Sequence, residues 1–527
     1  MGTDSVLAET AWTTSRLSAL ATRVGTASAD AAGQMPVRAP AVDEQIGSVP
    51  ELSAADVEAS VTRTRVAVDD WRRASVAERV AVVERFANLV AANRAELLDL
   101  VQLETGKSRT DAFEEVLEVP QSADYYAETA PSVLETDGRG TGLPLVTTAE
   151  VQYDPVGVVG VISPWNYPLV LSFTDLIPAL LAGNGVVLKP DEKTPFTALR
   201  LAELLEEAGL PAGVLTVVTG DGPTVGGALV DNVDYITFTG SSETGRTVAE
   251  RAGRNLIDCS LELSGKNPFI VLDDADIDEA VRGAITGAFT NAGQLCLATE
   301  QIYVAESLYE PFLDAFVTAT EELSLGAPFE YTADVGSLID GDQLTRVQSH
   351  VTDAVESGAT VHAGGSARPD VGPYFYEPTV LTGVPDSSLP ACEETFGPVV
   401  TVEPVASGAE AVETTNDSAY GLNASVWSED RERARALARR MHCGTVCIND
   451  AHLAGWAAYD APMGGVGQSG IGRRHGPEGL RRYTEPKTIA SSRIGPLGSV
   501  PGVPDHLFAR GASVATDVQR RLRQWWR

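Results

Sequence analysis

Val156-Gly157-Val158-Val159-Gly160-Val161-Ile162 is the stretch that decides the fold, because a short apolar run of this kind is typical of a strand buried on both faces. Strand and helix patterns alternate after it, with helices expected at 173–183 and 198–209 and strands at 185–188, 214–218 and 235–238. This alternation predicts an α/β fold with a parallel, doubly wound sheet. Such sheets bind ligands at the carboxyl ends of their strands, where Lys189 and Gly240 stand.

The chain is strongly acidic. Its 527 residues carry 73 Asp and Glu against 39 Lys and Arg, a formal net charge of −34. Dense like charge destabilises a compact chain unless salt shortens its range, from ~10 Å at 0.1 M to ~3 Å at 1 M. We therefore predict a halophilic protein of a salt-rich cytoplasm, and keep an ordinary acidic enzyme as the alternative. A surface of this sign disfavours nucleic acid as a partner.

Neither a membrane span nor a secretory signal is recognisable. No apolar run reaches the roughly 18 residues that a span needs, and the N-terminus shows no basic region followed by an apolar core. We therefore expect a cytoplasmic protein of two to four domains, without a membrane partner.

Cys296 is a candidate nucleophile, because it is a single thiol behind a Gly-Gln turn in the run Phe289-Thr290-Asn291-Ala292-Gly293-Gln294-Leu295-Cys296. A thiol needs a lowered pKa or a nearby base to attack carbon, so its partners must come from elsewhere in the chain. An odd total of five cysteines argues against a disulfide framework. Cys443 and Cys447 fall in an apolar, strand-like run, so we expect packed thiols there and no metal site.

Six motifs, taken in order, resemble the aldehyde dehydrogenase superfamily over roughly residues 53–489. They are Ser163-Pro164-Trp165-Asn166-Tyr167-Pro168, Lys189-Pro190-Asp191-Glu192-Lys193-Thr194-Pro195, Phe238-Thr239-Gly240-Ser241-Ser242-Glu243-Thr244-Gly245, Leu261-Glu262-Leu263-Ser264-Gly265-Lys266-Asn267-Pro268, Glu393-Glu394-Thr395-Phe396-Gly397-Pro398 and Pro462-Met463-Gly464-Gly465. The resemblance implies a Rossmann-like cofactor domain, an α/β catalytic domain and a β-hairpin that joins subunits into a homodimer or homotetramer.

The resemblance also implies domain boundaries. They are an N-terminal extension at 1–50, an NAD(P)-binding domain at 51–137 and 156–264, a catalytic domain at 265–442, oligomerisation segments and domain return at 138–155 and 443–495, and a C-terminal tail at 496–527. In the extension we expect a helix at 15–24 and then an unpatterned stretch. Ser53 to Asp56 predicts a capped helix start, and a second helix is expected at 76–106. The basic, Trp-rich end of the tail leaves subunit docking, disorder and membrane contact open.

The catalytic residues implied by the resemblance are Cys296, Glu262 and Asn166. Cys296 would attack an aldehyde carbon, Asn166 and the Cys296 backbone N–H would form the oxyanion hole, and Glu262 would activate water to release the acid. From its pattern alone, Glu262 between two leucines also fits the exposed face of a strand. Partial burial would instead raise its pKa towards that of a usable base.

The cofactor implied is NAD, with NADP possible. A carboxylate at Glu192 would repel a 2′-phosphate, although neighbouring Lys193 could soften that preference. Lys189 and Glu192 would meet the adenosine ribose, while Glu394 and Phe396 would bind at the nicotinamide. The full set of expected cofactor residues is Ser163, Trp165, Lys189, Glu192, Gly240, Ser241, Gly245, Leu263, Glu394 and Phe396.

Two glycine motifs offer a different class of function. Residues 240–247 have the spacing of a P-loop with Arg246 where lysine belongs, so a P-loop-like nucleotide-binding protein is one alternative. Against it, lysine is the residue that reaches the phosphates in that motif, and Glu243 would add negative charge to the cradle. Residues 465–470 match G-x-G-x-x-G but follow no strand, so we expect a tight loop. An inactive structural relative is a further alternative.

The substrate suggested by the resemblance is succinic semialdehyde. The runs 291–296, 420–427 and 472–479 look most like a prokaryotic succinic semialdehyde dehydrogenase branch. The better-known enzymes of that kind place arginines for the substrate carboxylate where this chain has Thr174 and Thr290. Unless Arg473, Arg474 or His475 replaces them, the substrate is an uncharged aldehyde, which gives a broad-specificity enzyme as the alternative.

Overall fold

The computed structural model describes residues 6–25, 33–143, 146–493, 495, 497–498 and 502–525. Parts of the expected N-terminal extension and C-terminal tail, and Leu145 of the expected hairpin, lie outside the described residues. The chain forms two compact units, Met1–Val133 with Pro155–Thr484 and Leu134–Asp154 with Glu485–Arg527.

The first unit contains the expected parallel sheet, in the strand order β17-β9-β8-β5-β6-β7. The chain runs outward from β5 to β6 and β7 and then returns to the other side of β5 as β8 and β9. The topological switch point therefore lies between β5 and β8. The prediction of a doubly wound α/β sheet is confirmed. Its strands are β5 Val158–Ile162, β6 Gly185–Lys189, β7 Leu215–Val217, β8 Tyr235–Thr239, β9 Asp258–Glu262 and the antiparallel edge strand β17 Gly470–Ile471.

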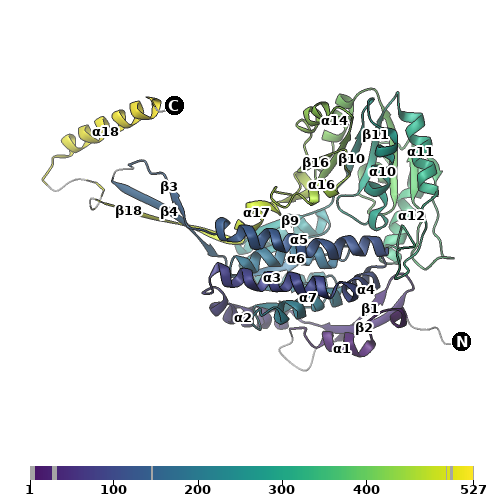
Figure 1. The fold of residues 1–527 in the computed structure, drawn as a ribbon, viewed down its shortest axis with the longest axis horizontal. Helices are drawn as coiled ribbons and strands as arrows, with labels where there is room; N and C mark the ends of the chain where they lie inside the picture. The colour runs from purple at the N-terminus through teal and green to yellow at the C-terminus, as the bar shows by residue number, and fades with distance from the viewer. Residues whose placement is uncertain are drawn as a thin grey trace. The chain divides into compact units, whose positions relative to one another are not determined.

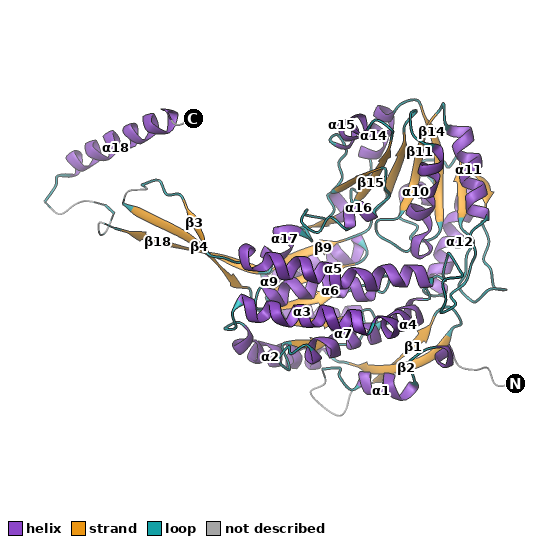
Figure 2. Ribbon diagram, viewed as in Figure 1, coloured by secondary structure: helices purple, strands orange, loops and turns teal. Residues whose placement is uncertain are grey.

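Helices cover this sheet, and α3, α5, α6 and α7 lie side by side in one layer (Figures 1 and 2). Helix α6 begins at Pro168, five residues before the expected start, because proline fits the first turn of a helix. The helices that follow strands of the sheet are α6 Pro168–Leu181, α7 Pro195–Glu207, α8 Gly227–Asn232 and α9 Ser242–Asn255. A π-helical turn, Gly222–Gly226, precedes α8.

The N-terminal part departs from two expectations. The stretch expected to be unpatterned contains a hairpin of β1 Gly33–Ala39 and β2 Glu44–Glu51, after the short helix Val6–Glu9 and α1 Thr14–Ala21. The helix expected at 76–106 is split at Asn93 into α3 Val76–Ala92 and α4 Arg94–Thr105, because the Asn93 amide caps the Leu89 carbonyl oxygen at 2.8 Å. Helix α2 Ala54–Trp71 starts with the predicted capping box. Helix α5, Arg109–Val133, follows α4.

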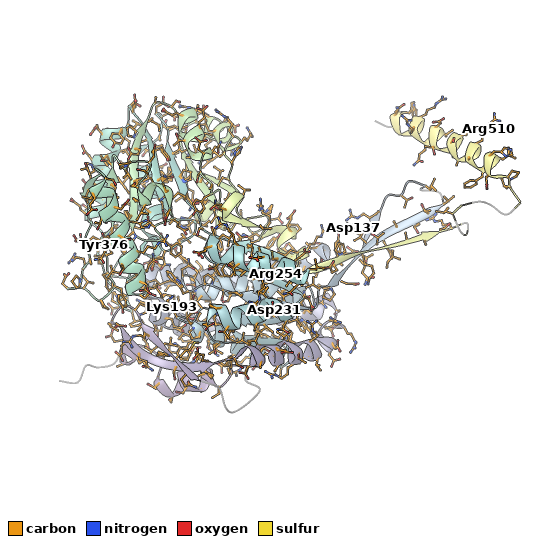
Figure 3. The ribbon with its side chains drawn as sticks, turned by 180° about the vertical axis from the view of Figure 1, so that it is seen from behind. Asp137, Lys193, Asp231, Arg254, Tyr376 and Arg510 are labelled. Carbon is orange, nitrogen blue, oxygen red and sulfur yellow. The ribbon has the colours of Figure 1, made fainter. Side chains whose placement is uncertain are left out.

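A seven-stranded sheet forms the rest of the first unit, in the order β12-β13-β14-β11-β10-β15-β16. Its core includes stacked Phe269 and Trp427 rings, 5.1 Å apart, and buried Tyr376, which Figure 3 labels. Strand β16 continues the sheet past residue 442, where we expected the catalytic domain to end. The strands are β10 Asn267–Val271, β11 Thr299–Ala305, β12 Thr360–Ala363, β13 Thr379–Thr382, β14 Val399–Val405, β15 Asn423–Trp427 and β16 Thr445–Ile448.

Helices and turns connect these strands. They are α10 Ile277–Phe289, the 3₁₀ turn Thr290–Gly293, α11 Tyr309–Glu321, α12 Gly341–Glu356, α13 Leu389–Cys392, α14 Gly408–Asn416, α15 Arg431–Ala438, α16 Leu453–Trp456, the 3₁₀ turn Gly467–Ser469 and α17 Gly476–Arg481.

The second unit is a three-stranded sheet with a terminal helix. Its strand order is β18-β4-β3, with β3 Asp137–Arg139, β4 Thr147–Pro155 and β18 Thr484–Ser492. An ion pair of Lys487 with Asp154 links β18 to β4. Helix α18, Asp505–Trp525, follows. Among the described residues, no helix combines the length and apolarity needed to cross a membrane.

Candidate active site

Cys296 follows a strained turn between α10 and β11. Asn291 and Ala292 adopt left-handed backbone angles, with φ of 53° and 54°, which cost free energy unless the surroundings hold them. Gly293 follows at φ 70°, and a Cβ there would stand 2.1 Å from the Gly397 carbonyl oxygen. The turn therefore requires glycine at this position, and it presents the half-buried Cys296 thiol to a cavity.

Hydrogen bonds from neighbouring segments hold this turn. The Gln294 side chain donates to the Asn291 carbonyl oxygen at 3.1 Å and accepts from the Ile339 N–H at 2.9 Å. The Asn267 side chain donates to the Cys296 carbonyl oxygen at 2.8 Å. Gln294 of the sequence motif thus braces the backbone that leads to Cys296.

Glu262 ends β9 and lines the same cavity as Cys296. It is 4% exposed, and neither of its carboxylate oxygens has a hydrogen-bond partner among the described residues. The alternative of an exposed strand face is therefore wrong. Burial raises the pKa of Glu262 to about 7, while the charges of Arg474 and Arg482 oppose the rise. A carboxyl group with this pKa suits a general base at neutral pH.

The Cys296 thiol is protonated at neutral pH in this state. Burial raises its pKa to about 12, and the charges of Glu394 and Glu262 add to the rise. Because only the thiolate is a good nucleophile, a reaction at this sulfur would need a base to take its proton. Glu262 is a carboxylate of the same cavity with both oxygens available for this.

Asn166 precedes α6, and its side-chain amide donates to the Gln294 carbonyl oxygen at 3.0 Å, in the turn before Cys296. Lys107, which sequence reasoning missed, holds it in place. The buried Lys107 ammonium donates to the Asn166 carbonyl oxygen at 2.8 Å and to Glu115 at 2.7 Å, and it lies 3.8 Å from the Tyr167 ring centroid. The scarcity of lysine in the chain was the only sequence signal for this role.

A buried ion-pair cluster near Glu262 was also missed. Arg474 donates to Asp175 at 2.7 and 3.1 Å and to the Thr239 hydroxyl at 2.8 Å. Thr239 and Glu262 are register partners on β8 and β9, so Arg474 reaches the residue beside Glu262. Arg482 donates to the same Asp175 carboxylate at 2.6 Å. The cluster places a net positive charge near the Glu262 carboxylate.

Replacing Arg474 with glutamine is expected to move the acidic limb of the pH–rate profile up by about one pH unit. Arg474 is the largest charge that lowers the pKa of Glu262, so without it the base ionises at higher pH. Measuring kcat/KM for one aldehyde between about pH 5 and pH 9 checks this. Arg474→Lys keeps the charge and should retain the wild-type profile. An unchanged limb in folded Arg474→Gln protein would contradict the role.

A cavity of about 220 Å³ reaches Cys296 and collects most of the expected cofactor residues. The Trp165 and Phe396 rings meet edge to face at 5.5 Å. Glu394 accepts from the Gly265 N–H at 2.9 Å, and burial raises its pKa to about 7. The expected residues in the lining are Asn166, Glu262 and Cys296 together with Trp165, Gly240, Ser241, Leu263, Glu394 and Phe396.

The other four expected cofactor residues lie at the carboxyl end of the parallel sheet but outside that lining. Lys189 is the last residue of β6, and its Nζ atom is 3.6 Å from the Glu192 carboxylate. The Ser163 N–H donates to the Lys189 carbonyl oxygen at 3.1 Å. Gly245 lies in the first turn of α9, where a Cβ would meet the Leu263 side chain at 2.4 Å. Glycine there lets the helix N-terminus approach the sheet end.

The loop that carries Glu394 and Phe396 is held by a buried ion pair, whose role the sequence did not reveal. The Lys266 Nζ atom lies 2.6 Å from Glu300. Glu300 accepts from the N–H groups of Thr395 and Phe396, each at 2.9 Å. This pair orients the loop towards the cavity.

The two glycine motifs have separate places. Residues 240–247 form the turn after β8 and the first turn of α9, with the Ser241 side chain accepting from the Thr244 N–H at 3.2 Å. Residues 465–470 form a loop that ends in β17, as expected from the absence of a preceding strand.

The thiols at Cys443 and Cys447 are packed. Cys443 donates to the Thr445 carbonyl oxygen at 3.0 Å, and Cys447 is buried. Over the described ranges of the chain, no three His, Cys, Asp or Glu side chains are grouped so as to hold a metal ion.

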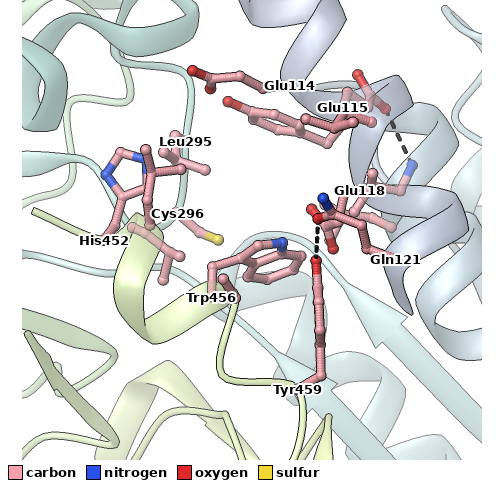
Figure 4. A pocket seen from close by; sticks show the side chains of 16 residues that line it. Glu114, Glu115, Glu118, Gln121, Leu295, Cys296, His452, Trp456 and Tyr459 are labelled. Atoms are coloured by element: carbon pink, nitrogen blue, oxygen red, sulfur yellow. Dashed lines mark hydrogen bonds between the residues drawn. The ribbon is translucent and has the colours of Figure 1, made fainter. Parts of the chain in front are cut away.

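A second cavity, of about 250 Å³, also reaches Cys296 (Figure 4). Its described lining is largely apolar and aromatic, and contains no lysine or arginine. Helix α5 contributes three glutamates to it, and Gln121 of the same helix accepts from the Tyr459 hydroxyl at 3.3 Å. The glutamates are Glu114, Glu115 and Glu118.

None of the side chains considered for a carboxylate clamp lines this second cavity. Thr174 is fully buried in α6, and Thr290 is the C-cap residue that follows α10. Arg474 is held in its ion-pair cluster, and Arg473 donates to backbone carbonyl oxygens of its own loop. His475 is buried behind the cavity, with its ring packed on Trp456 and Tyr459.

The chain is similar to known proteins over most of its length. A model of the aldehyde dehydrogenase family matches residues 27–489. A protein named "Putative succinate-semialdehyde dehydrogenase (NADP+) 2" from Mycobacterium bovis is 49% identical over 457 residues, which cover 87% of this chain and 88% of the relative. A protein named "Putative succinate-semialdehyde dehydrogenase (NADP+)" from Mycolicibacterium smegmatis is 47% identical over 493 residues, which cover 94% of this chain and 95% of the relative.

Solved structures share the fold. Betaine aldehyde dehydrogenase from Staphylococcus aureus, in complex with NAD+, aligns with a TM-score of 0.86 at 33% sequence identity. The alignment covers 92% of this chain and 98% of that chain. An aldehyde dehydrogenase from Bacillus cereus, also an NAD+ complex, aligns with a TM-score of 0.86 at 35% identity, covering 91% of this chain and 98% of that chain.

Proposed function

Because this chain belongs to the aldehyde dehydrogenase family, we propose that it oxidises succinic semialdehyde to succinate with a nicotinamide cofactor, through a thioester on Cys296. The observation that carries the reaction is the presence of Cys296, Glu262 and Asn166 in one cavity. The names of two relatives, at 49% and 47% identity, support succinic semialdehyde as the substrate. Membership of an oxidoreductase family sets aside the P-loop alternative.

The protein groups can perform each step. Glu262 takes the Cys296 proton as the sulfur bonds to the aldehyde carbon, and the carbonyl oxygen becomes an oxyanion. The Asn166 amide and the Cys296 backbone N–H stabilise that charge, and each donor of this kind contributes about 3 kcal/mol. Loss of a hydride turns the thiohemiacetal into a thioester. Glu262, having passed its proton to solvent, deprotonates the water that attacks the thioester and releases the acid and the thiol.

The residues of the first cavity fit a nicotinamide cofactor, which when bound supplies the hydride acceptor. Trp165 and Phe396 form an edge-to-face aromatic pair in the cavity that reaches Cys296. Glu394 can accept from ribose hydroxyls, and the N-terminus of α9 suits a pyrophosphate because its N–H groups and dipole favour anions. The tight packing at Gly245 supports this position for the helix.

We propose NAD as the preferred cofactor. The Glu192 carboxylate would repel the 2′-phosphate of NADP. Lys193 offers little compensation, because its Nζ atom already lies 3.5 Å from Asp340 and 4.0 Å from Asp191. The mycobacterial relatives are named for NADP+, whereas the staphylococcal structure holds NAD+.

An uncharged aldehyde is the second candidate substrate. The observation that favours it is the lining of the second cavity, which is largely apolar and whose described residues offer no lysine or arginine to a carboxylate. Pentanal represents this class, since its chain matches succinic semialdehyde closely in length but carries no charge.

A substrate panel tests the proposal. Purified protein at ~2 M KCl is given succinic semialdehyde or pentanal with NAD or NADP, and the absorbance of reduced cofactor is followed. At pH 7 we expect a higher kcat/KM for succinic semialdehyde than for pentanal, and a preference for NAD of about tenfold or more. Turnover of pentanal alone would select the second candidate. Absence of reduction with any aldehyde would overturn the proposed function.

Location, salt requirement and assembly complete the proposal. We propose a cytoplasmic homodimer or homotetramer that uses the β18-β4-β3 sheet as an oligomerisation segment, and activity at molar salt because of the net charge of −34. The domain boundaries of the sequence analysis stay part of this proposal, with the catalytic domain extended to include β16.

A further inference from the structure

Two buried polar atoms in the wall of the second cavity have no hydrogen-bond partner among the described residues. They are Glu118 Oε1 on α5 and His452 Nδ1 next to α16. His452 is only 4% exposed. A buried polar atom left unpaired costs about 1–3 kcal/mol. Because both atoms belong to the cavity that reaches the nucleophile, a substrate group can complete their hydrogen bonding.

Glu118 is surrounded by groups that favour its neutral form. Burial raises its pKa to about 8, and the charge of Glu115 adds to the rise, whereas a hydrogen bond from Trp456 and the charge of Arg474 oppose it. Glu115 itself is paired with Lys107 at 2.7 Å. At pH 7 most Glu118 side chains therefore carry an O–H that can donate a hydrogen bond.

The remaining titratable groups of the cavity wall add no cation. Glu114 has a pKa of about 7, raised by burial, and Tyr459 and Tyr167 have pKa values raised above 10 by burial. Burial lowers the pKa of His452 to about 4, so its ring is neutral and carries one N–H. Figure 4 shows Glu118 beside Trp456, and the Cys296 sulfur is turned towards the Trp456 ring.

We propose that neutral Glu118 and His452 are the hydrogen-bond donors that receive the carboxylate of the substrate, in place of an arginine clamp. This inference rests on the proposed function and specifies how a cavity without a cation holds succinic semialdehyde. Apolar surroundings can keep a carboxylic acid neutral at pH 7 so that it donates to an oxyanion. Recognition then lasts only while Glu118 keeps its proton.

The pH dependence of KM tests this role. Glu118 is neutral below its raised pKa and ionises above it, so the binding-competent fraction falls about tenfold between pH 7 and pH 9. KM for succinic semialdehyde is expected to rise by about that factor, while KM for pentanal changes by less than about twofold. Pentanal controls for Glu262 and Cys296, whose titration affects both substrates.

Variants separate the donor from its charge. Glu118→Leu is expected to raise KM for succinic semialdehyde at least about tenfold at pH 7 without raising KM for pentanal, and His452→Leu should act in the same direction. Glu118→Gln keeps a donor and should remove most of the alkaline rise of KM, leaving only the smaller part that ionisation of Glu114 adds. Glu128→Gln is the matched control, because Glu128 lies exposed on the same helix and outside the cavity.

The outcomes distinguish the inference from the function on which it rests. Turnover of succinic semialdehyde with the same pH dependence of KM as pentanal, or with wild-type KM in Glu118→Leu, would overturn the role of Glu118 and leave the proposed substrate standing. Turnover of pentanal without any turnover of succinic semialdehyde would refute the substrate itself.

Discussion

Cys296→Ala protein is expected to form no reduced cofactor with any aldehyde, a loss of at least about 10⁴-fold in kcat. Without the sulfur there is no covalent thiohemiacetal from which a hydride can leave. The Cys296 side chain follows a turn that is held by hydrogen bonds of Gln294 and Asn267. None of these bonds uses the sulfur, so the variant should fold. Steady-state turnover and a thermal unfolding curve, recorded at the same salt concentration, check both statements.

Cys259→Ala is the matched control for this change. Cys259 is another half-buried thiol, on β9 and outside both cavities, so its loss should leave turnover unchanged. Residual activity of Cys296→Ala within about tenfold of wild type would show that the thiol is not the nucleophile.

Glu262→Gln is expected to form reduced cofactor about 10³-fold more slowly than wild type, both in the first turnover and in the steady state. The amide is similar in shape but cannot take a proton from the Cys296 thiol or from water, so neither formation nor hydrolysis of the thioester is assisted. In wild-type protein the pKa of Glu262 is raised to about 7 and the ionised form is the base, so activity should rise with pH through about pH 7. Stopped-flow absorbance and mass spectrometry of the acylated chain measure these effects.

The comparison variant is Glu250→Gln, an exposed glutamate of α9 that should have wild-type kinetics. A burst of about one reduced cofactor per chain followed by slow turnover would instead restrict Glu262 to hydrolysis of the thioester. A wild-type steady state in Glu262→Gln would remove Glu262 from the mechanism.

The regular elements were predictable where the signal is local. Strand β5, the capped start of α2 at Ser53 and the turn after β8 each depend on residues within a few positions of one another. The hairpin at 33–51 was not predicted, because its strands gain stability by pairing with each other rather than from a strong periodic pattern. The break at Asn93 was missed because the apolar spacing continues through it.

The site was predictable as a set of residue types but not as an electrostatic system. The motifs named Cys296, Glu262 and Asn166, and the cavity brings them together. The buried partners that tune them come from distant segments: Arg474 and Asp175 are 299 residues apart in the chain. A single sequence does not reveal such a pair, because Arg474 and Asp175, each taken alone, have the pattern of ordinary surface charges.

By itself, the sequence determined the doubly wound fold and the candidate reactive groups, because apolar periodicity and short motifs encode strands, turns and such groups locally. Only the tertiary structure decided the ionisation of those groups and the character of the substrate cavity. Burial and neighbouring charges set the pKa values of Glu262, Glu118 and Cys296, and both depend on which distant segments pack around each side chain.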